Sequence, residues 1–282
     1  MAIFTSVNRI SILIALFISC IVPVVGQVMT NKPLYKEQRI IAFSSSEWIR
    51  SLDPQSHVHS ILLLAEDTSW SLVLSEFSIL RKNPVLINGS VRSEFDVKRF
   101  RSFHIVSVNG QSCSGVLGVA EDHLLGSWKI GDQAWEIVPQ RYIDSGRSHN
   151  EFVIRRDIWT EQNNTLCGVK NIAAVAPTQS LQASQPPCIV LDIALAADIT
   201  MVNRYGPGDQ SAVFMLSILN LVQGNYDDEF NSVIEFEVST IFIPMTAQDD
   251  PWFGITTIDD HLDKHRNWGE AGGYQGAPYA VA

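Results

Sequence analysis

The stretch from residue 188 to residue 243 most strongly constrains how this 282-residue chain can fold. Residues 188–195 form an almost unbroken apolar run, which is typical of a strand covered on both faces. Residues 209–226 carry apolar side chains at spacings of three and four, which predicts a helix with one apolar face and Asp209 as its N-cap. Residues 232–243 alternate in polarity, as a half-exposed strand does. This order of strand, helix and strand predicts an α/β unit with a parallel strand pair.

The preceding part of the chain is rich in predicted strands. Between residues 100 and 139, short apolar segments follow one another at intervals of roughly ten residues, with turn pairs such as Asn109-Gly110 between them. This spacing predicts an antiparallel meander or a sandwich. The expected fold class is therefore α+β, with a β-rich module followed by an incomplete α/β domain.

Two further segments set the predicted domain boundaries. Residues 1–26 have a short basic start and an apolar run that is too short for a membrane span, as in a secretory signal peptide. Residues 171–187 contain no charged residue and are rich in Ala, Ser, Gln and Pro, which is the composition of a linker. We therefore predict a signal peptide at 1–26, a β-rich module at 27–170, a linker at 171–187 and the α/β unit at 188–282.

Charge and cysteine content limit the partners of the secreted product. The chain has 20 Lys and Arg against 30 Asp and Glu, a net charge of −10, which argues against nucleic acid and anionic membrane as partners. No later segment is long and apolar enough to predict a stable membrane span. Cys113, Cys167 and Cys188 remain after removal of the signal, and this odd number leaves at least one thiol without a partner in the chain.

Residues 188–282 contain several short patterns: Leu195-Ala-Ala-Asp198, Tyr205-Gly206, Leu219-Asn-Leu-Val222, Tyr226 and Phe230-Asn231. Together they resemble the opening of a metzincin domain, and the most similar type is the ADAM/reprolysin-like zinc metalloprotease. The resemblance implies a propeptide followed by the first half of a catalytic domain, and hence a secreted zinc metalloendopeptidase zymogen that acts on protein substrates. The strand-rich propeptides of this family also end in a sequence similar to Gly131-Asp-Gln-Ala-Trp135-Glu-Ile137.

Cys167 is the most distinctive single residue. It lies in Leu166-Cys-Gly-Val169, just before the linker, and zinc takes a thiolate ligand well. By the resemblance it is a cysteine switch, a propeptide ligand to the catalytic zinc; the alternative is an ordinary disulfide with Cys113 or Cys188. Asn163 and Asn88 are candidate acceptors for N-glycosylation.

The catalytic signature of a metzincin, H-E-x-x-H-x-x-G-x-x-H, is absent, because none of the seven histidines is followed by Glu. His261 and His265 share the i, i+4 spacing of helical metal ligands, but the pattern of the helix predicted at 256–268 indicates that His265 packs inward. The acidic cluster at 227–229 is interpreted as a solvated helix end. We therefore predict no catalytic residue in these 282 residues and no peptidase activity for this chain.

Two other functions stay open at this point. The chain is alternatively a non-catalytic secreted protein that binds or inhibits a related metalloprotease through Cys167. A third interpretation is an unrelated β-sandwich interaction module, which rests on the meander at 100–139. The number of chains in the assembly is not predicted.

Overall fold

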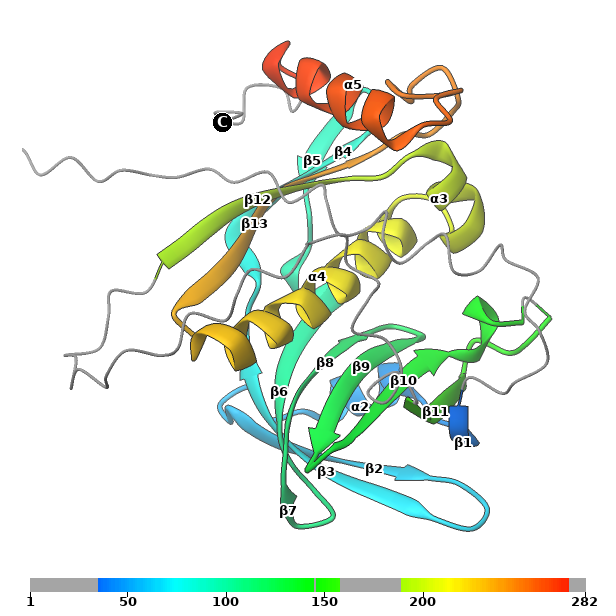
Figure 1. Cartoon of the computed structure of the whole chain (residues 1–282), viewed down its shortest axis with the longest axis vertical. Helices are drawn as coiled ribbons and strands as arrows, with labels where there is room; N and C mark the ends of the chain where they lie inside the picture. The colour runs from blue at the N-terminus through cyan, green and yellow to red at the C-terminus, as the bar shows by residue number, and fades with distance from the viewer. Residues whose placement is uncertain (1–34, 145, 158–188, 274–282) are drawn as a thin grey trace, which may run out of the picture.

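The computed structural model of the protein describes residues 35–144, 146–157 and 189–273 (Figure 1). More of these residues lie in strands, which form two sheets, than in the few helices that pack against them, so the α+β class is confirmed with strands as the commoner element. None of the helices in this part of the chain has the length and apolarity of a membrane span. The boundaries predicted at 26, 170 and 187 fall outside the described residues, and the division into domains stays a prediction.

The larger sheet is a curled antiparallel sheet of nine strands in the order β1-β11-β10-β9-β8-β6-β3-β2, with β7 paired to β6 (Figure 1). Strands β6, β8, β9 and β10 are the meander that the sequence predicts, each paired with the next. Positive φ angles at Asn109, Gly110 and Gly131 form two of the tight turns. The strands are β1 (Tyr35–Ala42), β2 (Val58–Leu64), β3 (Ser69–Phe77), β6 (Phe100–Val108), β7 (Gln111–Ser112), β8 (Ser114–Ala120), β9 (His123–Ile130), β10 (Gln133–Pro139) and β11 (Glu151–Asp157).

Sequence reasoning placed no element at β1, at β11 or at the short helix α2 (Ser45–Ser51). Helix α2 has Ser44 as its N-cap, and its Trp48 lies edge-on to Phe103, with the ring centroids 5.5 Å apart. These residues cover the apolar core of the larger sheet, which includes Leu72 and Phe152. A helix of seven residues is too short for a reliable apolar period, which is why the sequence pattern did not indicate it.

The smaller sheet has the order β12-β13-β4-β5. Strands β12 (Ile189–Ala196) and β13 (Ile234–Ile243) are parallel, as predicted. Strand β4 (Leu80–Asn88) pairs in parallel with β13, and β5 (Val91–Glu94) completes a hairpin with β4. Residues before and after the predicted linker thus share one sheet, which the sequence pattern did not indicate because strand pairing partners are not encoded in periodicity.

Helix α4 (Asp209–Phe230) connects the parallel pair and follows the short helix α3 (Ile199–Tyr205). Its N-cap is Gly208, with a φ of 59°, and not Asp209 as predicted. Asp209 is instead the first helical residue, and its carboxylate pairs with Arg99. The expected cap geometry occurs one helix earlier, where Asp198 accepts a hydrogen bond from the amide of Met201.

The elements stack in four layers (Figure 1): α5 (Ile258–Glu270), the smaller sheet, α4, and the larger sheet. Helix α4 contacts both sheets, and one apolar core joins Met215 and Leu219 of α4 with Leu191 of β12, Phe100 of β6 and Ala120 of β8. The first half of α4 is therefore buried nearly all round, although its sequence period predicted one apolar face. A helix between two sheets requires this wider apolar surface.

Helix α5 begins after Thr257, which caps it as predicted by accepting a hydrogen bond from the amide of Asp260. It covers the face of the smaller sheet opposite to α4. Trp252, 3% exposed, lies at the centre of this contact, between Phe242 of β13 and Trp268 of α5.

We expect Trp252→Ala to lower the free energy of unfolding by about 3–5 kcal/mol, because it removes a large buried side chain and leaves a cavity. Phe253→Ala is the matched control, since Phe253 is 63% exposed; its effect should stay within about 0.5 kcal/mol. Urea denaturation measures both changes. Equal effects of the two substitutions would contradict the packing of α5 on the sheet.

Candidate functional site

The interface between α4 and the larger sheet gathers most of the polar groups that the two layers bury. One glycine allows the helix to approach the strands closely. A Cβ atom at Gly224 of α4 would lie 2.8 Å from the side chain of Val116 of β8. A contact this short is repulsive, so the layer spacing there depends on the missing side chain. Within the larger sheet, a Cβ atom at Gly118 of β8 would lie 2.9 Å from the ring of Phe100 of the neighbouring strand β6.

A buried chain of hydrogen bonds crosses this interface at His123, the first residue of β9. The His123 Nε2 atom lies 2.7 Å from the Ser217 hydroxyl of α4, and Nδ1 lies 3.0 Å from the Tyr142 hydroxyl. Ser217 donates in turn to the carbonyl oxygen of Val213 at 2.8 Å. With that bond made, Nε2–H donates to Ser217 and Nδ1 accepts from Tyr142, which uses every polar atom of a neutral imidazole.

Burial lowers the pKa of His123 to about 3, and the nearby positive charge of Arg141 acts in the same direction. Burial likewise raises the pKa of Tyr142 to about 12. Both side chains are therefore neutral at physiological pH. Ser217 has no exposed surface, so its short distance to an imidazole does not make it a nucleophile that a substrate can reach. The arrangement serves to join the layers.

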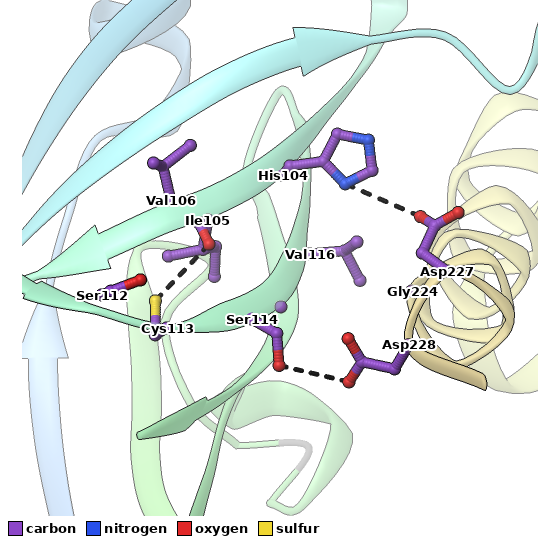
Figure 2. Close-up of a pocket in the computed structure, with 11 residues that line it drawn as sticks. His104, Ile105, Val106, Ser112, Cys113, Ser114, Val116, Gly224, Asp227 and Asp228 are labelled. Carbon is purple, nitrogen blue, oxygen red and sulfur yellow. Dashed lines mark hydrogen bonds and ion pairs between the residues drawn. The ribbon is translucent and has the colours of Figure 1, made fainter. Parts of the chain in front are cut away.

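A cleft of about 300 Å³ opens at the other end of the same interface, and we call it the α4 cleft (Figure 2). Strands β6 and β8, with the loop around Cys113, form one wall, and the last turns of α4 form the other. Asp227 of α4 points toward His104, with Oδ2 3.7 Å from Nδ1, and Ser114 donates to the carboxylate of Asp228 at 3.2 Å.

Asp227 is held from behind by Gln223. The Gln223 amide nitrogen donates to Asp227 Oδ1 at 2.8 Å and to the carbonyl oxygen of Ile234 at 2.9 Å, while its oxygen accepts from the amide of Phe236 at 2.7 Å. These bonds tie the end of α4 to the beginning of β13. They also fix the orientation of the Asp227 carboxylate, whose Oδ2 atom is inaccessible to solvent.

Burial shifts three titratable groups in the α4 cleft. It lowers the pKa of His104 despite the opposing effect of the Asp227 carboxylate. It raises the pKa of Asp227, although hydrogen bonds from Gln223 and Ser232 act in the other direction. Burial also raises the pKa of the Cys113 thiol to about 11, so this cysteine is a protonated, weakly reactive group.

Zinc, which the metzincin resemblance implies, requires several converging donors, three from the protein in a catalytic site. Among the residues that the structure describes, no three His, Cys, Asp or Glu side chains are grouped to hold a metal ion. His261 and His265 both lie against Trp252, at ring centroid distances of 5.6 and 5.0 Å, and burial lowers the pKa of His265 to about 4. The described residues do not fit a zinc site.

The other predicted site residues are placed as follows. Cys167 and Asn163 lie outside the described residues, so the cysteine switch and this glycosylation acceptor stay predictions. Asn88 ends strand β4 and is half-buried, and its Oδ1 atom is inaccessible to solvent.

Sequence reasoning missed His104, His123 and the inward position of Asp227. Two weak signals for the buried chain were present: Ser217 interrupts the apolar pattern of residues 212–219, and His123 precedes the apolar start of a strand. No signal distinguished Asp227 from its exposed neighbours Asp228 and Glu229.

Comparisons with known proteins add little to this geometry. No protein-family model matches the sequence, and no curated protein matches it significantly. Among solved structures, metalloproteinase-II from Bacteroides fragilis is similar to this chain with a TM-score of 0.36 and 10% identity, over 80% of this chain and 67% of that one. A likeness at this level carries no argument about fold or function, so the interpretation rests on the residues themselves.

The buried His123 predicts a loss of stability in acid. Its folded pKa, about 3, lies below the value of about 6.5 in an unfolded chain, so the unfolded state binds more protons. The contribution of His123 to the free energy of unfolding is fully present above about pH 6.5. It is lost as the pH falls toward 3, at up to about 1.4 kcal/mol per pH unit. His265 acts in the same direction.

Between about pH 7.5 and about pH 5, the free energy of unfolding should fall in both proteins. We expect the fall to be about 2 kcal/mol smaller in His123→Gln than in the unsubstituted protein. Denaturant unfolding at the two pH values measures this difference. His57→Gln is the control, because it makes the same substitution at an exposed position. If the free energy of unfolding depends on pH in the same way in His123→Gln and in the control, the pKa of His123 is not lowered in the folded state.

Proposed function

We propose that this chain is the N-terminal part of a secreted zinc metalloendopeptidase precursor, similar to the ADAM/reprolysin type of metzincin. The observation that carries the proposal is the arrangement of β12, α4 and β13. A parallel strand pair joined through one long buried helix is what the resemblance over residues 188–282 implies. Its patterns fall at the ends of β12, α3 and α4, apart from Leu219-Asn-Leu-Val222, which lies within α4. Asp198 caps α3, Gly206 ends it, and Tyr226 packs on Phe236 of β13.

The contact between α4 and the larger sheet also supports a precursor. In the proposed layout, residues 27–170 are the propeptide and α4 belongs to the protease part, so the His123–Ser217 bond lies between the two. Neutral, fully buried hydrogen bonds of this kind hold layers together without exposing charge. A propeptide that must stay bound until activation requires such a contact.

The zinc ion of the proposed enzyme needs ligands that the described residues do not supply. The proposal therefore requires an H-E-x-x-H-x-x-G-x-x-H helix in the complete protein, where the metal would be bound and would activate water. Cys167 is proposed as the propeptide thiolate that blocks this zinc. That role rests on its sequence context alone.

The alternative proposal is a non-catalytic secreted protein that binds or inhibits a related metalloprotease through Cys167. Both proposals use the same thiol, but they differ in whether the protein has its own zinc helix. The full-length transcript distinguishes them. An open frame after codon 282 that encodes H-E-x-x-H-x-x-G-x-x-H supports the precursor, and an in-frame stop at that codon rules the enzyme out.

The thiol itself is testable with the 282-residue chain. We expect the purified chain to inhibit an active ADAM-type metalloprotease in a fluorogenic peptide assay, and Cys167→Ser to weaken this inhibition at least about tenfold, because the hydroxyl is a poor zinc ligand. Cys113→Ser is the matched control and should inhibit like the unsubstituted chain, since the Cys113 thiol is half-buried and protonated. If the unsubstituted chain, Cys167→Ser and Cys113→Ser inhibit equally, Cys167 is not a cysteine switch.

A further inference from the structure

The β4–β5 hairpin leaves one sheet and completes the other. Along the chain it stands between β3 and β6, which pair with each other in the larger sheet, yet β4 itself pairs with β13 of the smaller sheet (Figure 1). The amide of Val238 on β13 extends this pairing by donating to the carbonyl oxygen of Ile79 at 2.7 Å. We call residues 35–157 the first part of the chain and residues 189–273 the second part. The first part thus donates a strand to the sheet of the second part.

Strand β4 packs into both apolar clusters of the smaller sheet. Leu80 and Leu86 are buried in the core that α4 shares with β12 and β13. Ile87 is buried in the other cluster, with Phe242 and Trp252 beneath α5. Because this apolar surface is removed from water on two sides, its burial favours association of the strand with the second part.

The hairpin and the part that accepts it are opposite in charge. Residues 78–99, between β3 and β6, hold five Lys and Arg against two Asp and Glu, whereas the second part holds three against 14. Arg81 of β4 lies 3.6 Å from the carboxylate of Asp192 on β12 and 4.0 Å from that of Glu237 on β13. The pair that Arg99 forms with α4 has the same polarity. Charge complementarity therefore adds to the strand pairing.

We propose that the first part is a strand-donating partner of the acidic second part, and that it stays bound when the chain between the two is cut. The edge of β13 accepts a basic hairpin whose first strand is apolar on two sides, as in other cases where an added strand completes a sheet. Backbone pairing, apolar burial and ion pairs each join the two parts directly. The connecting segment is therefore not required to hold them together.

For the proposed precursor, this inference rests on the function proposed above and adds a requirement for activation. A single cut between the two parts leaves β4 in the sheet of the proposed protease part. Release then requires β4 to leave β13, which exposes buried apolar side chains and an unpaired strand edge. Activation therefore needs a step beyond the cut.

The test is the full chain with the recognition sequence of a site-specific protease inserted after residue 175, cut to completion under reducing conditions so that no disulfide joins the fragments. We expect the two fragments to elute together from a size-exclusion column in about 0.15 M sodium chloride. Elution as separate fragments overturns the proposal. The measurement involves neither zinc nor Cys167, so its outcome is independent of whether the complete protein is an enzyme.

In the cut chain, Leu86→Ala should weaken association at least about tenfold, because it removes buried contacts of β4. Val91→Ala on β5 is the matched control, since Val91 is 64% exposed, and it should associate like the unsubstituted cut chain. Sedimentation over a dilution series measures both, and circular dichroism of the uncut variants checks that they fold. Equal association of the two variants would show that β4 does not join the parts.

Arg81→Glu tests the charge complementarity at a half-exposed position, where folding is least disturbed. It should weaken association severalfold in about 0.05 M sodium chloride and much less in about 1 M, because salt screens exposed charges. Lys82→Glu is the control: it makes the same charge change at the next position of β4, which is exposed. Equal effects of the two substitutions at low salt would contradict the role of Arg81.

Discussion

The burial of α4 between two sheets is the constraint on which the rest of the structure depends. Because both sides of the helix are covered, its apolar surface has to be wide, and the polar side chains within it need partners. Ser217 finds one in His123, and Gln223 finds three around Asp227 and β13. The same burial requires Gly224 where α4 lies against Val116 of the larger sheet.

The buried polar groups along α4 have different surroundings in the two halves of the helix. Around Ser217 the interface is closed, and every polar atom of His123 is bonded in its neutral form, which ties stability to pH. Around Asp227 the interface opens into a cleft, and charges remain. His104 is 40% exposed there and Asp227 14% exposed, so this end is accessible from solvent. An opening lined by charge is suited to ligand binding, whereas the closed end is suited to holding layers together.

The proposed precursor function depends on the strand–helix–strand unit and on a thiol outside the described residues. Helix α4 belongs to that unit and also packs on the larger sheet. Disturbing the packing of α4 should therefore weaken the contact between the proposed propeptide and the proposed protease part.

The sequence by itself determined the local elements: the parallel pair around α4, the meander strands and the Thr257 cap of α5, since periodicity and capping act over a few residues. Cys167 and the absence of H-E-x-x-H were also visible there. Only the tertiary structure decided that β4 joins β13, that His123 meets Ser217 across 94 positions, and that Asp227 turns inward. Such contacts join residues far apart in the chain, and neither periodicity nor spacing encodes which distant segments will meet.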